Sequence, residues 1–425
     1  MATKVLDVEV QDLADSGEGL ARHAGSLLLV PGALPGERVR VSVEGRAKHV
    51  AVVEWLERSP ERIEPKCAVA GRCGGCDWQH VSLAMQRGVH RDAVRRSLPP
   101  ALRGVEMTEE LEPLESELSG FRYRTRARLA WSMQGGELQL GHRARGSRDV
   151  VDTRECVVLH AILERALIDL ARELPTVSDK GELFLALGAD QKPVASLRPE
   201  GKLLAGGFAA HDRLVAAGFA GAELYAPGAS VPNRAGDPRP CVLASDGAPL
   251  WLAPEGFAQA HEGLNGALGA YVAEQAQCEG RKVLELFAGA GNLTVLLARR
   301  AKKVRAVELD RLATLALQGN VAARGLRNVS VQCEGAERVV TEGFREEVVV
   351  LDPPRTGARE VCEIINKTPP RTLVYVSCDP PTFGRDAGIL SASMELVSLR
   401  TFEMFPQTVH VEVVGTFVRR RKGSP

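Results

Sequence analysis

The chain has 425 residues, of which 44% are hydrophobic and 25% charged, proportions typical of a soluble globular protein. Its 54 basic and 54 acidic side chains balance, so contact with nucleic acid would need a local basic patch. No apolar signal segment opens the chain and no stretch of about 18 apolar residues occurs, so neither secretion nor a membrane span is expected. Nine scattered cysteines indicate a reducing cytoplasm, and we expect a monomer without a membrane partner.

Residues 1–60 contain short predicted strands separated by turns rich in glycine and proline. The strands are expected at 5–10, 26–30, 37–43 and 50–55. Several short strands at this spacing predict a small β-barrel of the OB type. Such barrels bind oligonucleotides in some proteins and are structural modules in others, and composition leaves both interpretations open.

The remainder of the chain divides by its pattern into two regions. Residues 61–250 hold a cysteine cluster, a predicted helix at 83–98 and then mostly strands, with a helix at 160–173 and a loop at 227–240. From 251 to 425 helices alternate with buried strands, which predicts a doubly wound, Rossmann-like sheet. The expected fold is therefore multidomain α/β, with a barrel, a mostly β central domain and a C-terminal α/β domain.

A glycine-rich turn follows the first strand of the C-terminal region. The strand Val283–Phe287 leads into Ala-Gly-Ala-Gly-Asn292 and then into a helix at 293–300, an arrangement that lets a ligand approach the backbone. Glu308 ends the next strand, where a carboxylate can accept hydrogen bonds from ribose hydroxyls. A dinucleotide-binding dehydrogenase would carry a third glycine at the position of Thr294. Its absence favours S-adenosylmethionine, which has no diphosphate.

Two later strands end at reactive side chains. Asp352 begins Asp-Pro-Pro-Arg and Cys378 lies in Ser-Cys-Asp-Pro-Pro, so both should meet a ligand at the carboxyl edge of the sheet. A Cys378 thiolate could add to C6 of uracil and make C5 nucleophilic toward a methyl group. A base must then remove the C5 proton. Glu412, in the apolar segment 408–414, is the best candidate, although a charge on an edge strand explains it equally well.

A second group of cysteines lies early in the chain. Cys67, Cys73 and Cys76 are close in sequence, and Cys156 is available as a fourth ligand. Structural zinc usually takes two closely spaced pairs, whereas one triplet plus a distant cysteine also fits an iron–sulfur cluster. Spacing therefore favours iron–sulfur over zinc, with a site that binds no metal as the third interpretation.

Together these motifs resemble the RNA 5-methyluridine methyltransferase family, in particular its 23S ribosomal RNA branch. The resemblance covers essentially the whole chain, including Phe287–Asn292, Asp352–Arg355, Cys378 and His410-Val-Glu412, and the first 60 residues resemble an RNA-binding TRAM domain. It implies a [4Fe–4S] cluster on Cys67, Cys73, Cys76 and Cys156. It places S-adenosylmethionine against Gln259, Phe287, Asn292, Glu308 and Asp352, and it makes Cys378 the nucleophile and Glu412 the general base.

Two positions depart from the family pattern. Asp379 stands where the family often has asparagine, and an extra carboxylate beside Cys378 should raise the pKa of its thiol. Gly335 stands where an asparagine near the adenine is found in relatives of the 23S branch, so that contact is not expected here.

The segment 121–129 alternates four arginines with apolar and aromatic residues, which predicts a strand with a basic face. RNA contact is favoured over an ordinary exposed basic strand. A target uridine must leave its stack to reach Cys378, so single-stranded or loop RNA with a flipped base is expected. The alternatives are a tRNA uracil-C5 methyltransferase, a non-catalytic RNA-binding protein with a degenerate methyltransferase domain, and an RNA cytosine-C5 enzyme. The RNA cytosine enzymes typically have a cysteine after the proline of the Asp352-type loop, so Asp-Pro-Pro-Arg favours uracil.

Overall fold

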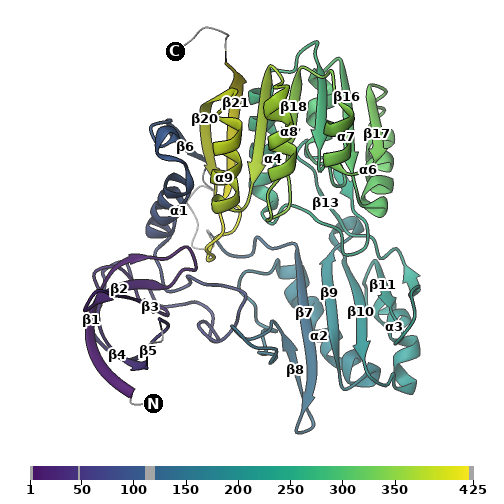
Figure 1. The fold of residues 1–425 in the computed structure, drawn as a ribbon. Helices are drawn as coiled ribbons and strands as arrows, with labels where there is room; N and C mark the ends of the chain where they lie inside the picture. Colours follow the sequence, from purple (N-terminus) through teal and green to yellow (C-terminus); the bar gives the residue numbers. More distant parts are fainter. Residues whose placement is uncertain (1–2, 46–47, 111–119, 421–425) are drawn as a thin grey trace.

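The computed structural model describes residues 3–45, 48–110 and 120–420. The chain forms an N-terminal barrel, a central sheet with helices on one side and a large C-terminal sheet layered between helices (Figure 1). Among the described residues, no helix is both long enough and apolar enough to cross a membrane.

The N-terminal unit is a five-stranded antiparallel sheet that curls into a barrel, in the order β3-β2-β1-β4-β5 (Figure 1). Val8, Val10, Val39 and Val41 alternate inward along their strands and fill its core. The four predicted strands are present, and β2 is additional. The bounds are β1 (Thr3–Leu13), β2 (Gly19–His23), β3 (Ser26–Val30), β4 (Arg38–Glu44) and β5 (Ala51–Glu57).

The central sheet has the order β12-β11-β10-β9-β7-β8. Helices α2 (Ala161–Val177) and α3 (Ala210–Ala216) cover one face, where Leu167 and Leu183 share one apolar core. On the opposite face, the described residues form a small apolar cluster around Phe184. Strand β12 lies inside the segment predicted as loop 227–240. The strands are β7 (Arg126–Gln134), β8 (Glu137–Gly141), β9 (Lys180–Leu187), β10 (Pro193–Glu200), β11 (Gly221–Leu224) and β12 (Asn233–Gly236); short 3-10 turns occur at Ala189–Gln191 and Ala205–Ala209.

The C-terminal sheet has eight strands in the order β17-β16-β15-β18-β19-β21-β20-β6. The first five are mutually parallel, whereas β21 runs antiparallel to both of its neighbours. A two-stranded ribbon, β13 (Cys241–Leu243) with β14 (Pro249–Trp251), precedes the sheet. The strands are β15 (Lys282–Leu286), β16 (Lys303–Glu308), β17 (Val329–Cys333), β18 (Val348–Leu351), β19 (Thr372–Ser377), β20 (Met394–Phe402) and β21 (Glu412–Arg419).

Helices cover both faces of this sheet because alternate residues of its buried strands point to opposite sides. In β15, Leu284 packs in one core and Val283 in the other. One face carries α4 (Glu262–Gln275), α5 (Thr294–Arg300) and α6 (Arg311–Ala323), and the other α7 (Ala336–Glu342), α8 (Arg359–Lys367) and α9 (Pro380–Leu390). The doubly wound arrangement predicted from the sequence is confirmed.

A segment far upstream completes the C-terminal unit. Helix α1 (Leu83–Ser97) packs Val94 into the same core as Phe383 of α9. After a 3-10 turn (Pro100–Leu102), β6 (Met107–Glu110) adds to the sheet edge parallel to β20. Part of the predicted central domain 61–250 therefore contributes one helix and one strand to the C-terminal sheet.

Candidate active site

The reactive side chains gather where the parallel strands end. Asp352 follows β18 and Cys378 follows β19, two adjacent strands. Because β21 is antiparallel to β19, it begins at the edge where β19 ends, and Val413 pairs with Ser377. This register brings Glu412 to Cys378. Strand β21 lies between β19 and β20, so the edge-strand explanation of Glu412 is wrong.

A cavity of about 790 Å³ opens at this edge of the sheet. Its lining includes all seven residues predicted to bind the cofactor or to catalyse the reaction: Gln259, Phe287, Asn292, Glu308, Asp352, Cys378 and Glu412. Glu285 also lines it, although the sequence reasoning missed that residue. A carboxylate inside the apolar strand β15 was the available signal, because buried carboxylates are rare without a partner or a function.

The glycine-rich turn gives the cavity its first wall. Phe287 has a positive φ of 62°, and Gly291 has a φ of 95° with Leu317 Cδ1 only 2.4 Å from where a Cβ would lie. Glycine suits position 291 because any other residue would be strained at this φ and its Cβ would displace the end of the Leu317 side chain. Glu308 Oε2 accepts a hydrogen bond of 2.8 Å from the backbone N–H of Gly289. The carboxylate is thus fixed at the turn with acceptor capacity left for hydroxyl groups.

Two amide side chains have different surroundings in the cavity. Asn292 forms a reciprocal amide pair with Asn265 at 2.9 and 2.7 Å and accepts from the Ser245 backbone N–H, which ties the turn to α4 and to the end of β13. Gln259 Nε2 lies 3.5 Å from Asp352 Oδ2, whereas its buried Oε1 has no protein hydrogen-bond partner. Glu285 Oε2 is also buried without a partner. Both oxygens are therefore candidates for contact with a bound ligand.

The buried carboxyl groups of the cavity resist ionisation. Burial raises the pKa of Asp352 to about 7 and that of Glu285 to about 8. Burial, followed by the charge of Asp352, raises the pKa of Glu412 well above its usual range. Since each ionised carboxylate opposes the ionisation of the next, the group favours a proton or a cationic ligand.

The thiol of Cys378 is held mainly in its protonated form. Burial, and then the nearby Glu412, raise its pKa to about 12, whereas Arg355 lowers it. Asp379 raises this pKa as well, but it ranks last among these causes. Its carboxylate caps α9 by accepting from the Thr382 backbone N–H at 2.9 Å. The family departure at Asp379 is therefore a helix cap with a minor effect on the thiol.

The loop that leads to Glu412 is held by the cysteine-rich segment and α1. The backbone N–H groups of Asp77 and Trp78 donate to Gln407 O at 2.8 and 3.0 Å. The buried amide of Gln86 accepts from Gln407 N at 2.9 Å and donates to its side chain at 3.1 Å. His90 bridges Glu403 and Thr408 O in the same loop. No sequence pattern predicts these contacts, because they join positions more than 300 residues apart.

The four predicted ligand cysteines share one region and are free thiols. Burial raises the pKa of Cys73, Cys76 and Cys156, and the pKa of Cys73 is raised further by Cys156 and Cys67 nearby. The backbone N–H of Gly75 donates to Cys73 Sγ at 3.3 Å. In the described ranges, no three His, Cys, Asp or Glu side chains form a group that could hold a single metal ion.

The predicted arginine row is wrong in its first half. Strand β7 begins only at Arg126, since Arg122 has a positive φ of 58° and interrupts the alternation. Arg122 pairs with Glu164, and Arg124 donates to Gly75 O at 3.0 Å beside the cysteines. Arg126 and Arg128 alone remain on the face of β7 opposite the helices. Arg126 lines the cavity and lies over the ring of Phe257.

Comparison with known proteins assigns the chain to a family. The 23S rRNA (uracil(1939)-C(5))-methyltransferase RlmD of Enterobacter sp. (strain 638) is 34% identical over 432 residues, which cover 97% of this chain and 96% of that protein. The chain belongs to the RNA uracil-C5 methyltransferase family. The RlmD protein of Cronobacter sakazakii (strain ATCC BAA-894) is 35% identical over 434 residues, or 98% of this chain and 96% of that protein.

Family models agree with this assignment, and a solved structure shares the fold. The model described as tRNA (Uracil-5-)-methyltransferase matches residues 252–421, and the TRAM domain model matches residues 1–51. The Pyrococcus abyssi tRNA (uracil-54, C5)-methyltransferase, solved in complex with S-adenosyl-L-homocysteine, superposes with a TM-score of 0.73 at 23% identity, covering 97% of this chain and 100% of that one. The predicted family, the TRAM domain and the S-adenosylmethionine-dependent methylation of RNA uracil are confirmed.

Proposed function

We propose that this RNA uracil-C5 methyltransferase modifies a uridine of 23S ribosomal RNA through a covalent adduct with Cys378. The main observation in support of this mechanism is that Cys378 and Glu412 line the same cavity as the predicted cofactor residues. The 23S substrate is supported by relatives named for it, which are 34–35% identical over nearly the full chain. A tRNA uridine is the second candidate, because the Pyrococcus abyssi enzyme shares the fold.

The residues of the cavity fit S-adenosylmethionine. Glu308 is fixed at the end of β16 with acceptor capacity for ribose hydroxyls. The buried carboxyls of Glu285 and Asp352, together with the unpartnered oxygen of Gln259, suit the positively charged methionine part. Asn292 and Phe287 shape the turn around it. The bound cofactor supplies an electrophilic methyl group and a positive charge.

The chain's own side chains perform the remaining steps. The Cys378 thiolate forms a bond from sulfur to C6 of the flipped uracil, and the electron pair of the C5–C6 double bond moves toward C5 and the carbonyl. C5 then takes the methyl group, whose bond to the sulfonium sulfur of the cofactor would break and leave its electron pair on that sulfur. C5 now carries both the methyl group and its original hydrogen. The Glu412 carboxylate removes this hydrogen as a proton, the double bond re-forms and the sulfur–C6 bond breaks. Cys378 therefore leaves as a thiolate, and the product is 5-methyluridine.

We also propose that Cys67, Cys73, Cys76 and Cys156 hold a [4Fe–4S] cluster. A cluster occupies more space than one ion, so its four sulfur ligands need not converge on a single point. The Gly75 N–H donated to Cys73 and the guanidinium of Arg124, which lies close enough to lower the pKa of Cys76, are contacts that stabilise negative sulfur. Such cysteines stay available as ligands in the cytoplasm, where we place the enzyme.

Trapping tests the catalytic assignment. RNA containing 5-fluorouridine has no removable C5 proton, so it should remain covalently attached to the enzyme after methyl transfer. Cys378→Ser should abolish this adduct, whereas the matched control Cys333→Ser, at an exposed cysteine outside the cavity, should retain it. Glu412→Gln should accumulate a denaturation-resistant adduct with ordinary RNA. Failure of the wild-type enzyme to trap any 23S fragment or tRNA would refute the mechanism.

Two further measurements test the substrate and the cluster. Mapping of 5-methyluridine in ribosomal RNA and tRNA from a deletion strain should show one lost site in 23S RNA, and loss confined to tRNA would favour the second candidate. Anaerobically purified enzyme should be brown with about four irons per chain. A colourless preparation containing one zinc per chain would overturn the cluster.

A further inference from the structure

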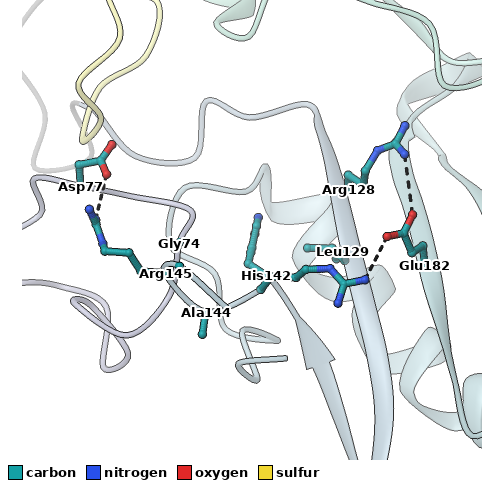
Figure 2. Close-up of a pocket in the computed structure, with 10 residues that line it drawn as sticks. Gly74, Asp77, Arg128, Leu129, His142, Ala144, Arg145 and Glu182 are labelled. Carbon is teal, nitrogen blue, oxygen red and sulfur yellow. Dashed lines mark hydrogen bonds and ion pairs between the residues drawn. The ribbon is translucent and has the colours of Figure 1, made fainter. Parts of the chain in front are cut away.

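A second cavity, of about 380 Å³, opens on the central sheet face that α2 and α3 leave uncovered. Figure 2 shows residues that line it. We call it the arginine pocket. Its lining combines three guanidinium groups, two carboxylates and an imidazole, supplied by Arg128, Arg143, Arg145, Asp77, Glu182 and His142. The volume lies within the range of sites for small organic ligands.

Ion pairs orient the three arginine side chains but do not use all of their N–H donors. Glu182 binds Arg143 at 3.0 Å and Arg128 at 3.9 Å, and Asp77 binds Arg145 at 2.9 Å (Figure 2). The exposed fraction of the side chain is 37% for Arg143, 61% for Arg128 and 44% for Arg145. Each guanidinium has five N–H donors, and exposed ion pairs are worth only about 0–1 kcal/mol. A phosphate can therefore engage the remaining donors in bidentate geometry at little cost.

One wall of the arginine pocket is the cysteine loop itself. The backbone N–H of Gly74 donates to Arg143 O at 2.9 Å, and that of Arg145 donates to Arg72 O at 3.1 Å. The Arg145 side chain also donates to Cys76 O at 3.0 Å. A Cβ on Gly74 would lie 3.0 Å from Arg143 O, so the two segments touch closely. The position of two of the three arginines thus depends on the conformation of the 72–76 loop.

Strand β7 connects the arginine pocket to the active site. Arg126 lines the catalytic cavity and Arg128 lines the arginine pocket, and both side chains point to the same face of the strand. Two residues along a strand span about 6.6 Å. Glu255, which accepts from Arg128 at 3.2 Å, is followed two positions later by Phe257 at the catalytic cavity. A polynucleotide that leaves the catalytic cavity across β7 would therefore pass the arginine pocket.

We propose that the arginine pocket binds one nucleotide of the substrate RNA that flanks the target uridine, with the arginines on its phosphate and His142 against its base. The inference rests on the proposed function and extends it to a defined RNA subsite. Planar imidazole and guanidinium groups are suitable partners for unstacked bases. The same geometry gives the cysteine loop a role in RNA binding, because that loop builds the wall of the pocket.

The test combines arginine variants with RNA in which single phosphates are neutralised. Arg143→Ala and Arg145→Ala are compared with Arg172→Ala. This matched control is on α2, on the opposite side of the sheet from the arginine pocket, and its side chain is 73% exposed. The probe is a 23S RNA hairpin containing the target uridine, unmodified or with one methylphosphonate at each flanking position. Affinity is measured by fluorescence anisotropy over a salt series, and S-adenosyl-L-homocysteine binding by calorimetry verifies the fold of each variant.

Each pocket variant should weaken RNA binding at least tenfold and reduce the slope of log affinity against log salt by about 0.7, the value for one phosphate contact on a single strand. One methylphosphonate position should cause no further loss in Arg143→Ala, because both changes remove the same contact. Arg143→Lys should keep the salt slope while losing part of the affinity. Arg172→Ala should behave as wild type.

Two outcomes would overturn the proposal. One is wild-type affinity and salt slope in both pocket variants, which would leave the arginines as a surface ion-pair network. The other is full additivity of Arg143→Ala with every methylphosphonate, which would assign the lost affinity to general charge. Failure of the proposed function is distinguishable, since it would appear as absent trapping by the wild-type enzyme whatever the RNA affinity.

Discussion

The protonation of Cys378 provides a quantitative test of the active site. Its pKa of about 12, against an ordinary value of 9.0, means that about one thiol in ten thousand is ionised at pH 8, compared with about one in ten for an unperturbed cysteine. The thousandfold lower thiolate fraction is partly offset, because a more basic thiolate is intrinsically more nucleophilic, with a Brønsted slope of about 0.4–0.5. We therefore expect alkylation about 30- to 60-fold slower than for an ordinary thiol.

The cofactor should reverse this effect by its charge. An opposite charge within about 4–6 Å lowers the pKa of a thiol by about 1–3. After the same offset by nucleophilicity, bound S-adenosylmethionine should increase the alkylation rate about 3- to 60-fold relative to bound S-adenosyl-L-homocysteine. The two ligands block access to the same extent but differ in the charge on sulfur. The comparison therefore separates electrostatics from shielding.

The assay is iodoacetamide alkylation followed by mass spectrometry of the Cys378 peptide. Exposed Cys333 provides an internal standard in the same sample. Without cofactor, the Cys378 rate should rise about tenfold per pH unit without levelling up to pH 10. A plateau near pH 9, or equal rates with the two ligands, would refute the argument that burial and Glu412 keep this thiol protonated.

Three other predictions follow from buried or capping side chains. Glu285 holds its proton up to pH about 8 in the folded state but only to about 4.5 when unfolded, so its contribution of roughly 5 kcal/mol should be lost as pH rises across that window. Glu285→Gln should flatten the pH dependence of urea unfolding of the ligand-free enzyme, and an unchanged slope would contradict this assignment. Asp379→Asn should keep the α9 cap and increase the rate of Cys378 alkylation less than tenfold. Asp379→Ala should also lower the free energy of unfolding by about 1 kcal/mol, because the cap is lost. An increase in the alkylation rate above tenfold in either variant would mean that the carboxylate dominates the thiol pKa. Gln86→Ala, which breaks the amide contacts to Gln407, should cost about 2–4 kcal/mol in urea unfolding, and a loss under 1 kcal/mol would show that water replaces the amide.

The sequence by itself determined the features that depend on neighbouring residues. Apolar runs of four to six residues marked the buried strands, and the reactive side chains that closely follow two of these runs identified Asp352 and Cys378 as site residues. The glycines at 289 and 291 marked a turn that needs positive φ, and the structure has both there. These features are local because strand period and turn chemistry are set within a few residues.

Only the tertiary structure decided the features that depend on strand order and on contacts between distant segments. Glu412 is central because β21 inserts antiparallel between β19 and β20, and a single strand carries no signal of its neighbours. The arginine row was divided by a positive φ at Arg122, which pairs with Glu164, whereas Arg124 donates to Gly75 O in the cysteine loop. The hydrogen bond that Gln407 in the loop before Glu412 donates to Gln86 likewise joins residues 321 positions apart. Such pairings follow from the free energy of burying whole faces together, which no local pattern encodes.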